Sequence, residues 1–87
     1  MLTAEDVKTK LREIPFTPFR IVTSSGEGYD VTHPDSVLVT KRVLYVGVYR
    51  RVGATVPDQA ASVSMLHVSA LEPLTASGTL GGELQAS

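Results

Sequence analysis

Two basic pairs and three tyrosines are the side chains whose types and spacing could support binding chemistry. Lys41-Arg42 and Arg50-Arg51 lie on either side of the run Val43–Tyr49, at opposite ends of an expected strand about 23 Å long. Basic side chains bind phosphate, and tyrosine rings stack on nucleic-acid bases. The alternative is that basic residues at turns are solvated and protect strand edges from pairing. The residues that would form a nucleic-acid surface are Lys41, Arg42, Tyr45, Tyr49, Arg50 and Arg51.

Residues suited to acid–base, nucleophilic or metal chemistry are few. The chain has two histidines, His33 and His67, and no cysteine, and this set matches no metal-ligand spacing. Asp30, Asp35 and Asp58 lie in turn-like segments, where aspartate is favoured for local hydrogen bonding. We therefore predict no catalytic residue, no metal site and no cofactor, and we expect that the protein is not an enzyme.

Length and charge limit the classes of protein that remain. The chain has 87 residues and a net charge of −1, which indicates one small domain with a thin core and argues against a general polyanion binder. Charges throughout Met1–Arg12 argue against a signal peptide, and no apolar run approaches the roughly 18 residues of a membrane span. A cytoplasmic protein without membrane contact is expected.

The N-terminal segment carries the signals of a helix. Thr3 is a suitable N-cap with Asp6 three residues later, close to a capping box. Leu2 and Val7 are spaced as a hydrophobic staple. Pro15 is expected to end the helix at about residue 13 or 14.

The rest of the chain is typical of short antiparallel strands. Phe19–Val39 predicts a three-strand meander, followed by strands at Val43–Tyr49 and Ser62–Val68 and a final short strand or turn at Ser69–Leu74. We predict a mainly β fold in which an N-terminal α-helix precedes a small, strongly bent, five-stranded antiparallel sheet or barrel of the SH3-like or Sm-like type. Residues 1–74 would form this single domain, with a disordered tail at 75–87.

The strands appear apolar on both faces in sequence, which favours a contact with another chain. A half-exposed strand alternates apolar and polar residues, whereas Val43–Val48 and Met65–Val68 do not. Covering both faces would require the helix, a second copy or a protein partner, so we expect a homo-oligomer. The interface residues would be Leu44, Val46, Val48, Met65, Leu66 and Val68.

Two resemblances bear on the class. The segments PFTPFRI, GEGYDVTHPDSVLV and SMLHVSALEPL resemble a group of short uncharacterised bacterial proteins that share a PFRPFRI entry, an HP(D/E) step and a terminal LLHIxxIEPL. That group has no established activity, so the resemblance implies nothing catalytic. The order of a helix and five strands is also similar to Sm-like RNA-binding barrels, and Asp35 falls roughly at that family's loop aspartate. The Gly and Asn that flank this aspartate in the family, and the Arg-Gly pair of its second motif, are absent here, so no RNA-binding residue is carried over.

Two functions follow as hypotheses. The first is a non-catalytic interaction module that self-associates or docks on a protein partner through apolar strand faces and edges. The second is an oligomeric small barrel that binds RNA or DNA through Lys41-Arg42 and Arg50-Arg51 with the nearby tyrosines.

Overall fold

The fold is mainly β with one short N-terminal helix. The computed structural model describes residues 1–51 and 53–74. Its elements are α1 (Ala4–Leu11), β1 (Phe19–Thr23), β2 (Gly28–Val31), β3 (Val37–Val39), β4 (Val43–Val48), β5 (Gln59–Ser64) and β6 (Val68–Pro73), with 3₁₀ turns η1 (Pro34–Ser36) and η2 (Met65–His67). The predicted helix and the mainly β class are confirmed. The tail predicted at 75–87 lies outside the described residues.

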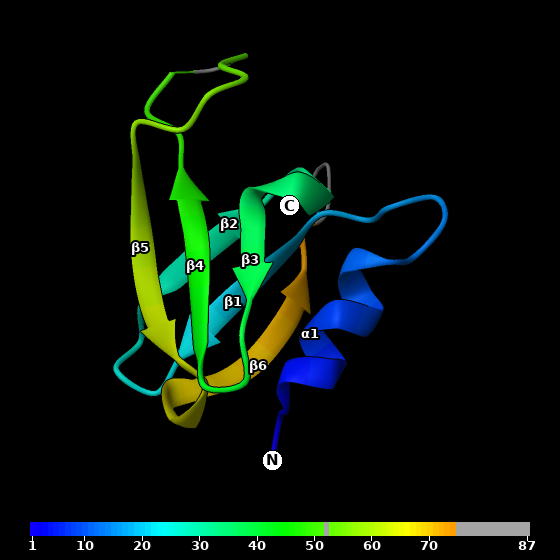
Figure 1. Ribbon diagram of the computed structural model, residues 1–87, viewed down its shortest axis with the longest axis vertical. Coiled ribbons are helices and arrows are strands. Elements are labelled where there is room, and N and C mark those ends of the chain that lie inside the picture. The colour runs from blue at the N-terminus through cyan, green and yellow to red at the C-terminus, as the bar shows by residue number, and fades with distance from the viewer. Residues whose placement is uncertain (52, 75–87) are drawn as a thin grey trace, which may run out of the picture.

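The six strands form two three-stranded antiparallel sheets, with the orders β2-β1-β6 and β3-β4-β5. One sheet lies in front of the other with its strands crossing those behind (Figure 1). The prediction of a five-stranded bent sheet or barrel was wrong, because the described strands number six and form two sheets that do not close into a barrel. The physical reason lies in η1, because Pro34 offers no N–H for strand pairing and the backbone and hydroxyl of Ser36 donate to the His33 carbonyl at 3.1 and 2.7 Å. The chain therefore leaves one sheet at Val31 and enters the other at Val37.

The second departure lies between β5 and β6, where one continuous strand was predicted at Ser62–Val68. The Ser64 hydroxyl accepts a hydrogen bond from the Leu66 N–H at 3.3 Å, which helps to form the turn η2. Serine competes in this way with strand pairing. Val68 then begins β6 in the other sheet, which accounts for the sixth strand.

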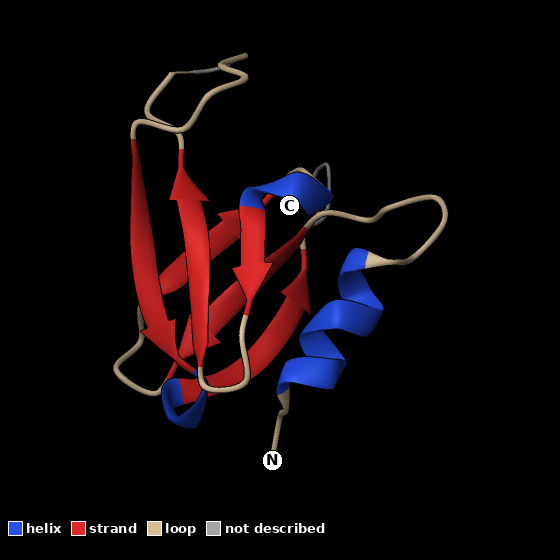
Figure 2. Ribbon diagram, in the orientation of Figure 1, coloured by secondary structure: helices blue, strands red, loops and turns tan. Residues whose placement is uncertain are grey.

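Helix α1 begins as its sequence predicts. The Asp6 N–H donates to the Thr3 hydroxyl at 3.3 Å and the Thr3 N–H donates to the Asp6 carboxylate at 2.8 Å, so the capping box is complete. The helix ends at Leu11, earlier than predicted, with Arg12 as its cap. It lies beside the two sheets, on the side where β3 and β6 are the edge strands (Figure 2). Its Val7 is completely buried.

The core lies between the two sheets and beneath α1. Alternate residues of each strand face inward, as the period of a strand requires. Phe19 is its largest buried side chain, and its ring packs edge-to-face against Phe16 with centroids 6.2 Å apart. The buried apolar residues are Val7, Phe19, Ile21, Val31, Val37, Leu44, Val46, Val63, Met65 and Val68.

The alternation in this core predicts a contrast between two leucines of neighbouring strands. Leu44 is 0% exposed and Leu38 is 64% exposed. Leu44→Ala is expected to lower the free energy of unfolding by about 2–5 kcal/mol, since it removes buried methyl groups and leaves a cavity. Leu38→Ala, the matched control, is expected to change it by no more than about 0.5 kcal/mol. Urea unfolding of both variants measures the difference. Equal losses of unfolding free energy would contradict the inward orientation of Leu44 and the outward orientation of Leu38.

Candidate functional site

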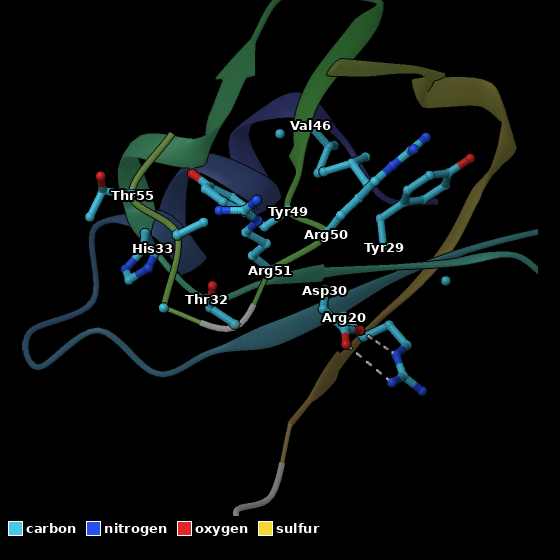
Figure 3. A pocket seen from close by; sticks show the side chains of 15 residues that line it. Arg20, Tyr29, Asp30, Thr32, His33, Val46, Tyr49, Arg50, Arg51 and Thr55 are labelled. Carbon is cyan, nitrogen blue, oxygen red and sulfur yellow. Dashed lines mark hydrogen bonds and ion pairs between the residues drawn. The ribbon is translucent and has the colours of Figure 1, made fainter. Parts of the chain in front are cut away.

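A cleft of about 850 Å³ opens between β2 and the C-terminal half of β4. Tyr29 and Asp30 of β2 form one wall together with His33 beyond it, and the loop that follows β4 forms another. Figure 3 shows these side chains around the opening. The cleft therefore lies where strands of the two sheets face each other without pairing.

Arg20 and Asp30 form an ion pair at the outer rim of the cleft. They are cross-strand neighbours in the β1–β2 register, and the Arg20 Nε donates to the Asp30 Oδ1 at 2.7 Å (Figure 3). This hydrogen bond and the carboxylate charge raise the pKa of Arg20 above its ordinary value, so the guanidinium stays charged. Gly28 leaves room for the arrangement, because a Cβ there would lie 2.8 Å from the Arg20 Cδ. The positive charge of Arg20 is therefore balanced by the carboxylate of Asp30.

Two tyrosines supply aromatic surface inside the cleft. The ring of Tyr49 packs edge-to-face against His33, with centroids 6.1 Å apart and an interplanar angle of 73°. Tyr29 is half-buried, and its hydroxyl donates to the Glu27 carboxylate at 3.4 Å. Burial, and then the charge and hydrogen bond of Glu27, raise the pKa of the Tyr29 phenol. Tyr29 therefore remains neutral near physiological pH.

Arg50 and Arg51 bring positive charge to the cleft. Within residues 1–51 and 53–74, neither guanidinium forms an ion pair. The Asp58 carboxylate accepts a hydrogen bond from the Arg50 backbone N–H at 2.7 Å and holds the start of the loop. Gly47 allows the loop to approach β4, because a Cβ there would lie 3.1 Å from the Pro57 Cβ. The loop therefore places two exposed arginines at the mouth of the cleft.

The residues predicted to bind nucleic acid do not form one surface. Tyr49, Arg50 and Arg51 line the cleft, whereas Lys41-Arg42 lies in the turn at the other end of β4. Tyr45 lies in the middle of β4 and is 42% exposed. The structure therefore divides the predicted set into a cleft half and a turn half.

The residues predicted to form an apolar interface are mostly in the core. Leu44, Val46, Met65 and Val68 are buried, so they offer no surface to a partner. Leu66 is 80% exposed, and Val48 is half-buried. The runs appear apolar in sequence because Tyr45 and Gly47 occupy positions between the inward-facing residues of β4. Any interface must therefore use other residues than these four.

The outer edge of β5 offers an alternative contact surface. β5 pairs with β4 along all six of its residues and is the last strand of its sheet. The Met65 N–H donates to the Arg42 carbonyl at 2.8 Å, which fixes the phase of hydrogen bonding in this ladder. Hydrogen-bonded pairs alternate along antiparallel strands. The backbone groups of Ala61 and Val63 therefore face β4, and those of Ala60, Ser62 and Ser64 face away from it.

The other three edge strands are less open to pairing. β3 has three residues and lies against α1, where Leu11 and Val39 line a common small pocket. β6 ends in Glu72-Pro73, which adds a charge and removes an N–H. β2 carries Asp30 and forms a wall of the cleft. Among the described edge strands longer than three residues, β5 alone has neither a charged residue nor a proline.

Comparison with protein-family models, with curated proteins and with solved structures finds no match for this chain. Within the described part of the chain, no three metal-binding side chains lie close enough together to hold an ion. No described helix has the length and apolar character needed to cross a membrane.

Sequence reasoning missed two features of these surfaces. The ring of His33 packs against Tyr49, and no local spacing signals a contact between residues so far apart in the chain. The β5 edge was missed because the strand was placed at Ser62–Val68. Its signal is the uncharged run that begins at Gln59 and continues with small residues from Ala60.

The tight contact at Gly28 predicts coupling to Arg20. Gly28→Ala is expected to lower the free energy of unfolding by less than about 1 kcal/mol, because it displaces Arg20 from an exposed ion pair. In an Arg20→Ala background the same change is expected to be neutral or stabilising by about 0.5 kcal/mol, since alanine restricts the unfolded chain more than glycine. A double-mutant cycle in urea measures this coupling. Identical effects of Gly28→Ala in both backgrounds would contradict it.

Proposed function

We propose that this protein is a non-catalytic interaction module that self-associates through β5. In this proposal the β5 edge of one copy pairs with the β5 edge of a second copy, and two three-stranded sheets become one six-stranded antiparallel sheet. The observation that carries it is the uncharged edge on which Ala60, Ser62 and Ser64 direct their backbone groups away from β4. An open edge of this kind is a template for another strand.

The composition of β5 suits a two-fold axis. With Ser62 on the axis, Ala60 of each copy lies opposite Ser64 of the other, so no like charges meet. Ser62 is also the cross-strand neighbour of Tyr45, which is the neighbour of Leu38. All three are exposed on the outer face. Pairing would therefore extend this row across both copies and cover part of Tyr45.

The alternative of RNA or DNA binding along the whole of β4 is less well supported. It requires Lys41-Arg42 and Arg50-Arg51 to act on one ligand from opposite ends of the strand. The cleft does not extend along β4 from one basic pair to the other, because the only part of β4 that lines it is Val46–Val48. We therefore propose the protein–protein contact through β5 rather than nucleic-acid binding along the whole of β4.

The proposal predicts a concentration-dependent mass. Light scattering after size exclusion is expected to give about twice the 9.3 kDa of one chain at high concentration. Ser62→Lys is expected to return the mass to that of one chain, because two lysines would meet at the axis. Thr17→Lys adds the same charge on the exposed connector before β1 and is the control, for which the dimer mass is expected to persist.

A second variant separates loss of the contact from loss of the fold. Ser62→Pro removes an N–H that faces away from β4, so the β4–β5 ladder should keep its own hydrogen bonds while the outer edge is blocked. Thermal unfolding of each variant confirms that it is folded. A single-chain mass for the unmodified protein at every concentration up to about 1 mM would overturn self-association, as would a dimer that persists in both Ser62 variants.

A further inference from the structure

We propose that the cleft between β2 and β4 binds a nucleotide unit, that is, a planar base joined to a phosphate. The unit is either a free nucleotide or part of a single-stranded nucleic acid, since both present the same chemistry. The inference concerns a different surface from the β5 edge and does not depend on self-association.

The cleft is positively charged within a protein of net charge −1. Three arginines and one aspartate line it. Asp30 is paired with Arg20 at 2.7 Å, and Asp58 accepts a hydrogen bond from the backbone of Arg50. Among residues 1–51 and 53–74 the guanidinium groups of Arg50 and Arg51 have no ion-pair partner, so they remain for a ligand. Guanidinium binds phosphate oxygens through two parallel hydrogen bonds, which makes phosphate a suitable partner.

The aromatic side chains point to a ligand with a planar part. His33 meets Tyr49 edge-to-face, a contact that covers at most one face of the tyrosine ring. Figure 3 shows Tyr49 and Arg51 together on one side of the cleft, and Tyr29 and Arg50 extending toward the other. A tyrosine next to an arginine is the pairing that holds a base by stacking and its phosphate by charge.

The size of the cleft is consistent with a nucleotide rather than a bare anion. Its volume of about 850 Å³ falls within the roughly 300–1,000 Å³ of small-molecule sites. A phosphate ion alone would fill a small part of it and would leave the exposed surface of the two tyrosine rings without a contact to the ligand. The open mouth at Arg50-Arg51 also leaves room for a chain to continue beyond one unit.

The other basic pair provides a matched control within the same protein. Lys41-Arg42 has the same charge and exposure as Arg50-Arg51, lies at the opposite end of β4, and is not among the residues that line the cleft. Arg50→Gln with Arg51→Gln is therefore the test variant, and Lys41→Gln with Arg42→Gln is the control. Both remove two exposed positive charges, so a general charge effect would act on both equally.

The experiment is fluorescence anisotropy with a labelled ten-nucleotide single-stranded RNA and its DNA counterpart, beginning at 50 mM salt. Two phosphate contacts predict a log–log slope of the binding constant against salt of about −1.4. The Arg50/Arg51 variant is expected to lose binding and the Lys41/Arg42 variant to retain it. Tyr49→Leu is expected to weaken binding about tenfold through lost stacking, with its thermal midpoint measured to establish that it is folded.

Competition with uridine monophosphate and with inorganic phosphate identifies the source of the ligand. If the free nucleotide displaces the probe at the affinity of the oligonucleotide, the site takes free nucleotides. If the oligonucleotide binds much more tightly, it takes single strands; both results support the nucleotide unit. No binding of either probe at 50 mM salt, equal losses in the two double variants, or phosphate competing as well as the nucleotide would overturn it.

Discussion

The double pairing of β1 is the constraint on which the other elements depend. β1 is the central strand of its sheet, and its Phe19 is the cross-strand neighbour of Val31 in β2 and of Pro73 in β6. Beyond the strands, the Leu74 N–H donates to the Pro18 carbonyl at 3.0 Å. Phe19 and Ile21 are fully buried and anchor this sheet against the other. Because β1 pairs with β6, the last described strand, the chain must return through η2 from the sheet that contains β5 to the sheet that contains β1. The described strands therefore form two small sheets with four edge strands.

Both proposed surfaces follow from what covers those edges. Helix α1 lies along the side where β3 and β6 are edge strands (Figure 1). β2 faces the end of β4 without pairing, and the space between them is the cleft that Tyr49 and Arg50 line. No described strand pairs with the outer edge of β5. A barrel closed by hydrogen bonds would leave neither a gap beside β2 nor a free strand at β5, so both sites result from incomplete closure.

The sequence predicts what depends on neighbouring residues. The Thr3–Asp6 capping box and the turns that separate the strands are local, and they predict the helix start and the mainly β class. The break at η2 also has a local cause, the Ser64 hydroxyl, but apolar flanking residues obscured it. Residue contacts across sheets could not be predicted. The apolar run of β4 gave no sign that Leu44 faces the core, and no spacing relates His33 to Tyr49. Half of the predicted basic and aromatic set reached the cleft because Tyr49, Arg50 and Arg51 are adjacent in the chain.

Amide hydrogen exchange along β5 tests the central claim most directly, because it reads the edge residue by residue. The N–H groups of Ala61 and Val63 face β4, and we expect them to be protected at every protein concentration. The N–H groups of Ala60 and Ser62 face outward, and we expect them to exchange rapidly when dilute and to become protected as concentration rises. Rapid exchange of Ala60 and Ser62 at all concentrations, beside protected Ala61 and Val63, would show that the edge stays unpaired and would contradict the account.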